Sequence, residues 1–121
     1  MEEPSADIIA SLKAKFPNRS LHAVEASDGE DSFFFVMTGC NKDEYNKFTA
    51  DLLSAKEAKD DKAKNEAIKS AVERTAVAMI RWPDRETIQD LFANKPAMSL
   101  NFAEELHRAA GSNFEVRSKK L

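Results

Sequence analysis

The chain is poor in glycine, with only three among its 121 residues. Loops that hold phosphate groups need several glycines at fixed spacing, because their backbone amides must approach the ligand closely. The sequence contains no Walker loop, no dinucleotide-binding glycine motif and no Gly-x-Ser-x-Gly elbow of a serine hydrolase. We therefore expect no bound nucleotide and no cofactor.

Cysteine and histidine are also scarce, with one cysteine and two histidines. The single cysteine, Cys40, cannot form an internal disulfide, which suits a reducing cytoplasm. These three side chains cannot form a closed structural zinc site without carboxylates. The acidic residues Asp28, Glu30 and Asp31 lack the ligand order of a calcium loop and lie where a hairpin turn needs polar residues. We expect no metal site.

One catalytic arrangement is open to this composition, a nucleophilic Cys40 paired with His22 or His107. Cys40 precedes a predicted helix N-terminus, a position that lowers the pKa of a thiol. Alternatively, Cys40 is a small side chain at a strand-to-helix corner and His22 is an ordinary strand residue. We adopt this second interpretation and expect no catalytic residues, with a small cysteine-dependent enzyme as the alternative.

No excess of positive charge is present, since the formal net charge is −3 and the isoelectric point is about 5.4. Binding nucleic acid through its phosphates requires clustered Lys and Arg, so neither a nucleic acid partner nor a role as a DNA-binding regulator is expected. The start, "MEEPSADII", is acidic where a signal peptide is basic, and no apolar run is long enough to span a membrane. We expect a soluble, cytoplasmic protein without a membrane partner.

The N-terminal third predicts a helix followed by a β-hairpin. Ser5 is suited to cap a helix whose apolar residues have helical spacing and which ends at Pro17. The segment 20–38 then predicts a hairpin around Asp28-Gly29, a dipeptide that tolerates left-handed turn geometry. A loop of two residues and a loop of four residues place the same side chains on each face of the hairpin. One face carries His22, Val24, Phe33, Phe35 and Met37; the other carries Leu21, Ala23, Phe34 and Val36.

The remainder of the chain predicts helices separated by prolines. Asn41 and Glu44 form a capping-box pattern before a helix, and the charged stretch "AKEAKDDKAKN" that follows is either a solvated loop or the polar end of a helix. A longer helix is expected from about residue 62 to Arg81, because Pro83 pushes the residue before it out of helical geometry. A short helix capped by Asp84 and a last helix opening with a second capping box follow. The second box pairs Asn101 with Glu104, and Gly111 is the expected C-cap.

The resulting fold class is α+β, a predominantly helical single domain over residues 1–111 with a small N-terminal hairpin. Residues 112–121 carry no strong pattern, and we expect them to form a flexible tail.

Both faces of the predicted hairpin are apolar, so each needs to be covered by helices, by another copy or by a partner. The aromatic run Phe33-Phe34-Phe35 must point to both sides of its strand. We take one face as a surface for another protein, and we consider Trp82 as either a core residue or an interface anchor. The candidate protein-binding residues are Phe33, Phe35, Met37, Trp82, Leu91 and Phe92.

The order of these features resembles the tail assembly chaperones of long-tailed (siphovirus-type) bacteriophages. A strand ending in "VMTG" leads into the helix "NKDEYNKFTADLL", and a charged, alanine-rich stretch follows. A long helix then runs into "IRWPDRETIQDLFANKPAMSLNFAEEL" and "AAG", with prolines and a closing glycine where that family has them. The resemblance covers about residues 33–111 and consists of element order and proline placement, without a residue-level binding motif.

The resemblance implies a non-enzymatic protein of the bacterial cytoplasm that is absent from the finished virion. It implies binding to the tape measure protein and to the tail tube subunit during tail assembly, and it implies self-association. Many members also have a longer form made by a ribosomal frameshift, and Lys119-Lys120 is a place where a slippery codon run could lie. The main alternative is an export chaperone like those of type III secretion, or another protein-binding adaptor.

Overall fold

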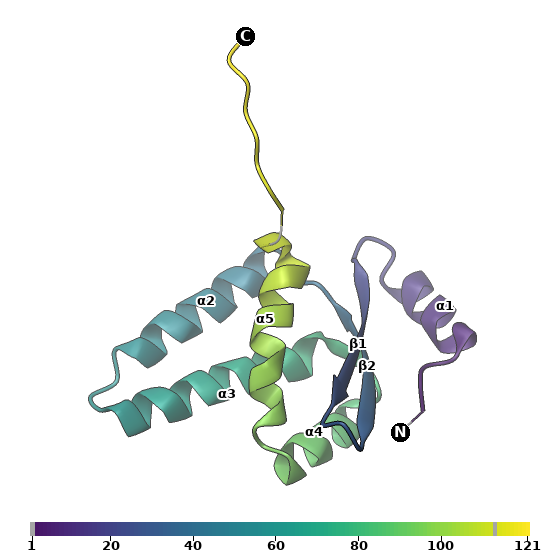
Figure 1. Cartoon of the computed structure of the whole chain (residues 1–121), viewed down its shortest axis with the longest axis horizontal. Helices are drawn as coiled ribbons and strands as arrows, with labels where there is room; N and C mark the ends of the chain where they lie inside the picture. The colour runs from purple at the N-terminus through teal and green to yellow at the C-terminus, as the bar shows by residue number, and fades with distance from the viewer. Residues whose placement is uncertain (1, 113) are drawn as a thin grey trace.

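A computed structural model describes residues 2–112 and 114–121; Met1, in the predicted domain, and Asn113, in the predicted tail, lie outside the described residues (Figure 1). In chain order the elements are α1 (Ala6–Lys15), β1 (Leu21–Ser27), β2 (Ser32–Thr38), α2 (Lys42–Lys56), α3 (Asp61–Met79), β3 (Ile80–Trp82), α4 (Arg85–Asn94), the 3-10 turn η1 (Met98–Asn101), α5 (Phe102–His107) and the π-helical turn η2 (Arg108–Ser112). The predicted class, α+β and mainly helical in one domain, is confirmed.

The hairpin forms as predicted. A four-residue loop from Asp28 to Asp31 joins β1 and β2, and Gly29 takes the left-handed conformation with φ 95°. In the antiparallel register Val24 pairs with Phe35, and Ala26 pairs with Phe33. The two predicted faces are therefore the two faces of the real sheet. We call the face with Val24 and Phe35 the inner face and the opposite one the outer face.

The third strand, β3, was not predicted. The long helix ends at Met79 and not at Arg81, and Ile80 to Trp82 pair antiparallel with β2. The reason is Pro83, which excludes helical geometry from Trp82. The extended backbone at this point pairs with the free edge of β2. This pairing provides hydrogen bonds for the backbone N–H and C=O groups that a longer helix would have provided. The sheet order is β1-β2-β3, so β2 is central and β1 is an edge strand.

Helix starts follow the predicted caps except at the last helix. The side chains of Ser5, Asn41 and Asp84 each accept a backbone hydrogen bond at a helix start, and Asn41 completes its capping box with Glu44. The predicted capping box at Asn101 is wrong, because Asn101 is itself helical (φ −68°, ψ −17°). The turn η1 already starts the helical backbone after Pro96, so α5 continues an existing helix and needs no cap of its own.

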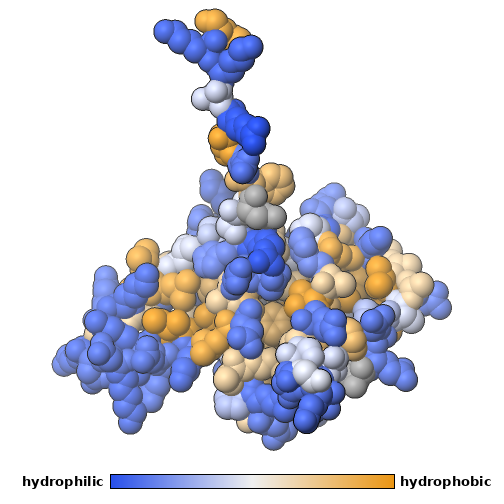
Figure 2. All heavy atoms as spheres, in the orientation of Figure 1, coloured by the Kyte–Doolittle hydropathy of each residue, from blue (hydrophilic) through white to orange (hydrophobic). Residues whose placement is uncertain are grey.

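The core lies between the inner face of the sheet and the helices α2, α3, α4 and α5, with α1 on the outer side of the sheet (Figure 1). Three aromatic rings meet there. Phe35 contacts Phe102 edge to face with centroids 5.1 Å apart, and Phe102 contacts Phe92 at 5.9 Å. The α2–α3 hairpin projects from this core, and its far end, which carries the charged stretch after Ala55, is hydrophilic (Figure 2).

Three of the expected protein-binding residues belong to this core. Phe35 and Met37 have no exposed surface, and Phe92 is 2% exposed. The inner face of the hairpin is therefore covered by the chain's own helices, which corrects the expectation that these side chains contact a partner.

The corner between β2 and α2 is held by Arg19. Its guanidinium donates to the carbonyl oxygen of Gly39 (Nη2 at 2.6 Å) and to Oε1 of Glu44 at 2.6 Å. The same Glu44 oxygen accepts from the backbone amide of Asn41, so one carboxylate closes both the capping box and the ion pair. Close packing adds to this, because a Cβ at Gly39 would lie 2.6 Å from the carbonyl oxygen of Ala109.

Burial of Phe35 predicts a large loss of stability on truncation. We expect Phe35→Ala to lower the free energy of unfolding by about 3–5 kcal/mol, since a fully buried ring is replaced by a cavity. Phe34→Ala is the matched control on the same strand, because Phe34 points to the outer face and is only partly buried. Urea unfolding followed by circular dichroism measures both; equal losses would contradict the assignment of the core face.

The Arg19 junction gives a second prediction. We expect Arg19→Ala to cost about 1.5–3 kcal/mol, as for hydrogen bonds to a charged group, because the side chains of Arg19 and Glu44 are both partly buried. Arg74→Ala removes a more exposed ion pair with Asp51 and should cost under about 1 kcal/mol. The same urea titration compares them, and a loss at Arg19 no larger than at Arg74 would show that the corner is held by packing alone.

Candidate protein-binding site

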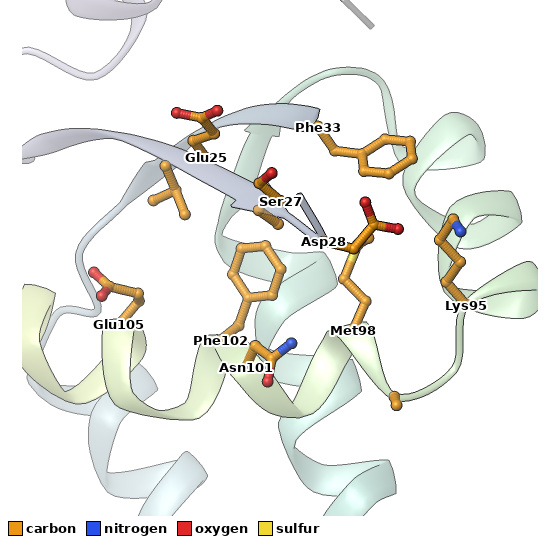
Figure 3. A pocket seen from close by; sticks show the side chains of 12 residues that line it. Glu25, Ser27, Asp28, Phe33, Lys95, Met98, Asn101, Phe102 and Glu105 are labelled. Atoms are coloured by element: carbon orange, nitrogen blue, oxygen red, sulfur yellow. The ribbon is translucent and has the colours of Figure 1, made fainter. Parts of the chain in front are cut away.

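A groove of about 440 Å³ lies between the second half of β1 and the segment that enters α5 (Figure 3). We call it the edge groove. Its apolar lining comes from β1, β2, η1, the residue before η1 and α5, and it consists of Val24, Ala26, Phe33, Ala97, Met98 and Phe102. Its polar rim includes Glu25, Asp28, Lys95, Asn101 and Glu105.

The edge groove follows from the strand order and from Pro96. With β2 in the centre of the sheet, the inner-face side chains of β1 lie at the margin of the helical layer and stay partly exposed. Lys95 ends α4, and the chain then turns through Pro96 into η1, which places Met98 opposite Phe33 (Figure 3). Phe33 pairs with Ala26 near the hairpin loop, so a methyl group and not a large side chain lies beside its ring.

The outer edge of β1 is open. Within residues 2–112 and 114–121, the sheet has no strand beyond β1, and β1 residues from Val24 to Ser27 border the edge groove. An edge strand presents a row of N–H and C=O groups that can pair with another extended chain. The edge groove thus combines backbone hydrogen-bonding groups with an apolar hollow for alternate side chains, the combination that β-strand addition uses.

The rim is mainly acidic. The carboxylate of Asp28 accepts hydrogen bonds from the backbone amides of Asp31 at 2.7 Å and Glu30 at 3.0 Å, and these bonds hold its pKa below the usual value. Asp28 is therefore an anion at neutral pH. Glu105 adds a second carboxylate, which is ion-paired with Arg108, and Glu25 lies beside the groove with its side chain on the outer face of β1. Lys95 is the cation on this rim, and its ammonium lies 5.7 Å from the centre of the Phe33 ring.

Of the six residues expected to bind a partner, the structure places only Phe33 in this groove. Trp82 lies half-buried beside Val36 on the outer face, and Leu91 is half-buried against the core. Met98 and Phe102 were not among the expected site residues. Their local pattern marks them only as helix residues after a proline, and their position beside β1 depends on tertiary packing.

Cys40 does not have the surroundings of a nucleophile. Burial raises the pKa of its thiol, and the neighbouring Glu44 carboxylate raises it further, against an opposing effect of Arg19. Both histidines have other partners: the ring of His107 is hydrogen-bonded to the Tyr45 hydroxyl at 2.9 Å, and that of His22 to the Ser20 hydroxyl at 3.0 Å.

The described residues contain neither a metal-binding cluster nor a membrane-spanning helix. Among them, no group of three or more His, Cys, Asp or Glu side chains is arranged to hold a metal ion. None of their helices combines the length and the apolar character needed to cross a bilayer.

Comparison of the chain with models of known protein families, with curated proteins and with solved structures finds no match.

The raised pKa of Cys40 predicts slow alkylation. At neutral pH the folded protein should react with iodoacetamide more slowly than the same protein unfolded in urea, because a higher pKa leaves less thiolate and burial restricts access. Mass spectrometry of the alkylated fraction against time measures both rates. A folded-state rate above the unfolded rate would contradict this assignment and revive a cysteine-dependent activity.

Proposed function

We propose that this protein is a non-catalytic tail assembly chaperone of a long-tailed phage. In this role it binds an apolar segment of the tape measure protein in the edge groove and keeps that protein soluble until the tail tube protein assembles around it. The observation that carries the proposal is an apolar hollow beside an open strand edge in a chain of net charge −3. The order of helices and prolines from β2 to Gly111 supports it as well.

Binding would proceed by strand addition. An extended segment pairs its backbone with β1, and every second side chain then points to the inner side, toward Phe33, Met98 and Phe102. Phe33 and Met98 can pack against apolar side chains of different shapes, because Phe33 has a large ring and Met98 a flexible thioether. The intervening side chains lie on the outer face, where Glu25 is the charged residue of β1.

The acidic rim adds selectivity. Asp28 at the rim and Glu25 on the outer face of β1 repel acidic segments and favour segments in which basic residues flank the apolar ones. The same charges keep the free chaperone soluble while its groove is empty. In the proposed setting the protein works in the bacterial cytoplasm during morphogenesis and is left out of the finished virion.

The proposal is tested by co-expression with the tape measure protein of the same genome. We expect the native chaperone to raise the soluble yield of that protein and to co-purify with it. Met98→Glu, which puts a charge into the edge groove, should weaken binding about tenfold or more, because a buried unpaired charge costs more than the roughly 1.4 kcal/mol that corresponds to one tenfold step.

Leu53→Glu is the matched control, since Leu53 is a 63% exposed apolar residue on α2, which contributes nothing to the groove lining. Thermal unfolding verifies that both variants stay folded, and Phe33→Ser provides a second groove variant that introduces no charge. Solubilisation that survives both groove variants would exclude the groove as the binding site. A native protein that fails to raise the soluble yield would exclude the chaperone function itself.

A further inference from the structure

The last residues of the chain include most of the large hydrophobic side chains that are exposed among the described residues. Among the described residues the exposed large hydrophobic side chains are Leu53, Phe114, Val116 and Leu121, and three of the four lie after η2. Phe114 and Val116 are 81% and 95% exposed. Figure 2 shows these apolar side chains between hydrophilic ones on a tail that projects from the body.

Residues 114–117, within a tail that has no strong overall pattern, alternate like a short half-buried strand. Phe114 and Val116 alternate with Glu115 and Arg117, so an extended backbone places the two apolar side chains on one side and the charged pair on the other. This is the pattern that the edge groove accepts, with apolar residues on the inner side and polar residues on the outer side of β1. Residues 114–121 also contain three basic residues and one acidic residue, opposite in sign to most of the groove rim.

The direction of the chain argues against a groove filled by its own tail. Ser20, just before β1, is hydrogen-bonded to Gly39, and Gly39 lies against Ala109, so the start of β1 and the end of the last helix are neighbours. A tail that folded back from Gly111 would therefore run parallel to β1 and would need a sharp reversal. In the structure it continues away from the body (Figure 1). A tail from another molecule can pair antiparallel, which is the more stable arrangement.

We infer that the tail of one molecule, through Phe114 and Val116, adds as a strand to the open edge of β1 in a second copy. Phe114 and Val116 enter the edge groove of that copy, and Arg117 or Lys119 lies on the outer face beside Glu25. The contact joins two different surfaces, so each bound molecule still offers a free tail and a free groove. Such head-to-tail contacts build chains or rings of several copies.

This inference deepens the proposed function, because it rests on the same groove. A tail docked there occupies the site that a tape measure segment needs. The assembled form thus keeps apolar tails and apolar grooves covered until a partner segment displaces the tail. Self-association can be measured on the purified full chain alone, so its failure is distinguishable from failure of tape measure binding.

Sedimentation velocity and light scattering over a range of protein concentrations test the inference. The native chain should increase in mass with concentration. The double variant Phe114→Ser, Val116→Ser should associate about tenfold or more weakly, because both anchoring side chains are removed. Leu53→Ser, which removes the exposed leucine outside the tail, is the control and should behave as native.

A charge exchange tests the pairing partner. Glu25→Lys and Arg117→Glu, each alone, should weaken self-association, and the two together should restore it toward the native value, since opposite charges across neighbouring strands attract. If Arg117→Glu does not restore self-association to the Glu25→Lys protein, Lys119→Glu is tested together with Glu25→Lys. If neither substitution restores self-association, the proposed register of the tail against β1 is wrong.

Three further outcomes would overturn the inference. A native chain that is monomeric at every concentration has no such contact. Association that persists in the Phe114→Ser, Val116→Ser variant must use another surface. A monomer whose hydrodynamic radius grows in that variant would show that the groove holds the tail of its own chain.

Discussion

The arrangement of the whole domain depends on one charge interaction at the corner between β2 and α2. Arg19 donates to the Gly39 carbonyl oxygen and to the Glu44 carboxylate, and Glu44 also completes the capping box of α2. The guanidinium thereby ties the approach to β1, the end of β2 and the start of α2 to one another. Because α2 packs on α3, and α3 runs directly into β3, the same corner sets the position of the third strand against β2.

The edge groove is a consequence of that arrangement. Once β3 occupies one side of β2, β1 is left as an open edge, and the helices that cover the inner face end short of its margin. The aromatic contacts of Phe102 with Phe35 and Phe92 then fix α5 beside this margin. Core packing and the candidate binding surface thus share one residue, Phe102, whose ring is buried at its back and borders the groove at its front.

Local signals were enough for much of the fold. Asp28-Gly29 and the alternation around it predicted the hairpin and both of its faces, and the caps at Asn41 and Asp84 predicted two helix starts. The third strand was missed because Ile80 to Trp82 continue the helical spacing of α3, and only pairing with the distant β2 makes them a strand. Most residues of the edge groove were missed for the same reason. Phe35 and Met37 are indistinguishable from a surface stripe until helices far away in the chain cover them, as Phe102 of α5 does for Phe35.

Gly39 is the point where the β2–α2 corner meets the last helix. Its backbone leaves no room for a side chain, because a Cβ would lie 2.6 Å from the Ala109 carbonyl oxygen and 3.0 Å from the Ser20 hydroxyl oxygen. During evolution this position can therefore change only together with the end of the last helix, although no left-handed turn requires a glycine there. In related chains, a glycine retained at this site would mark those that dock their C-terminal helix on the corner. A larger residue would mark those in which the end of this helix has moved outward.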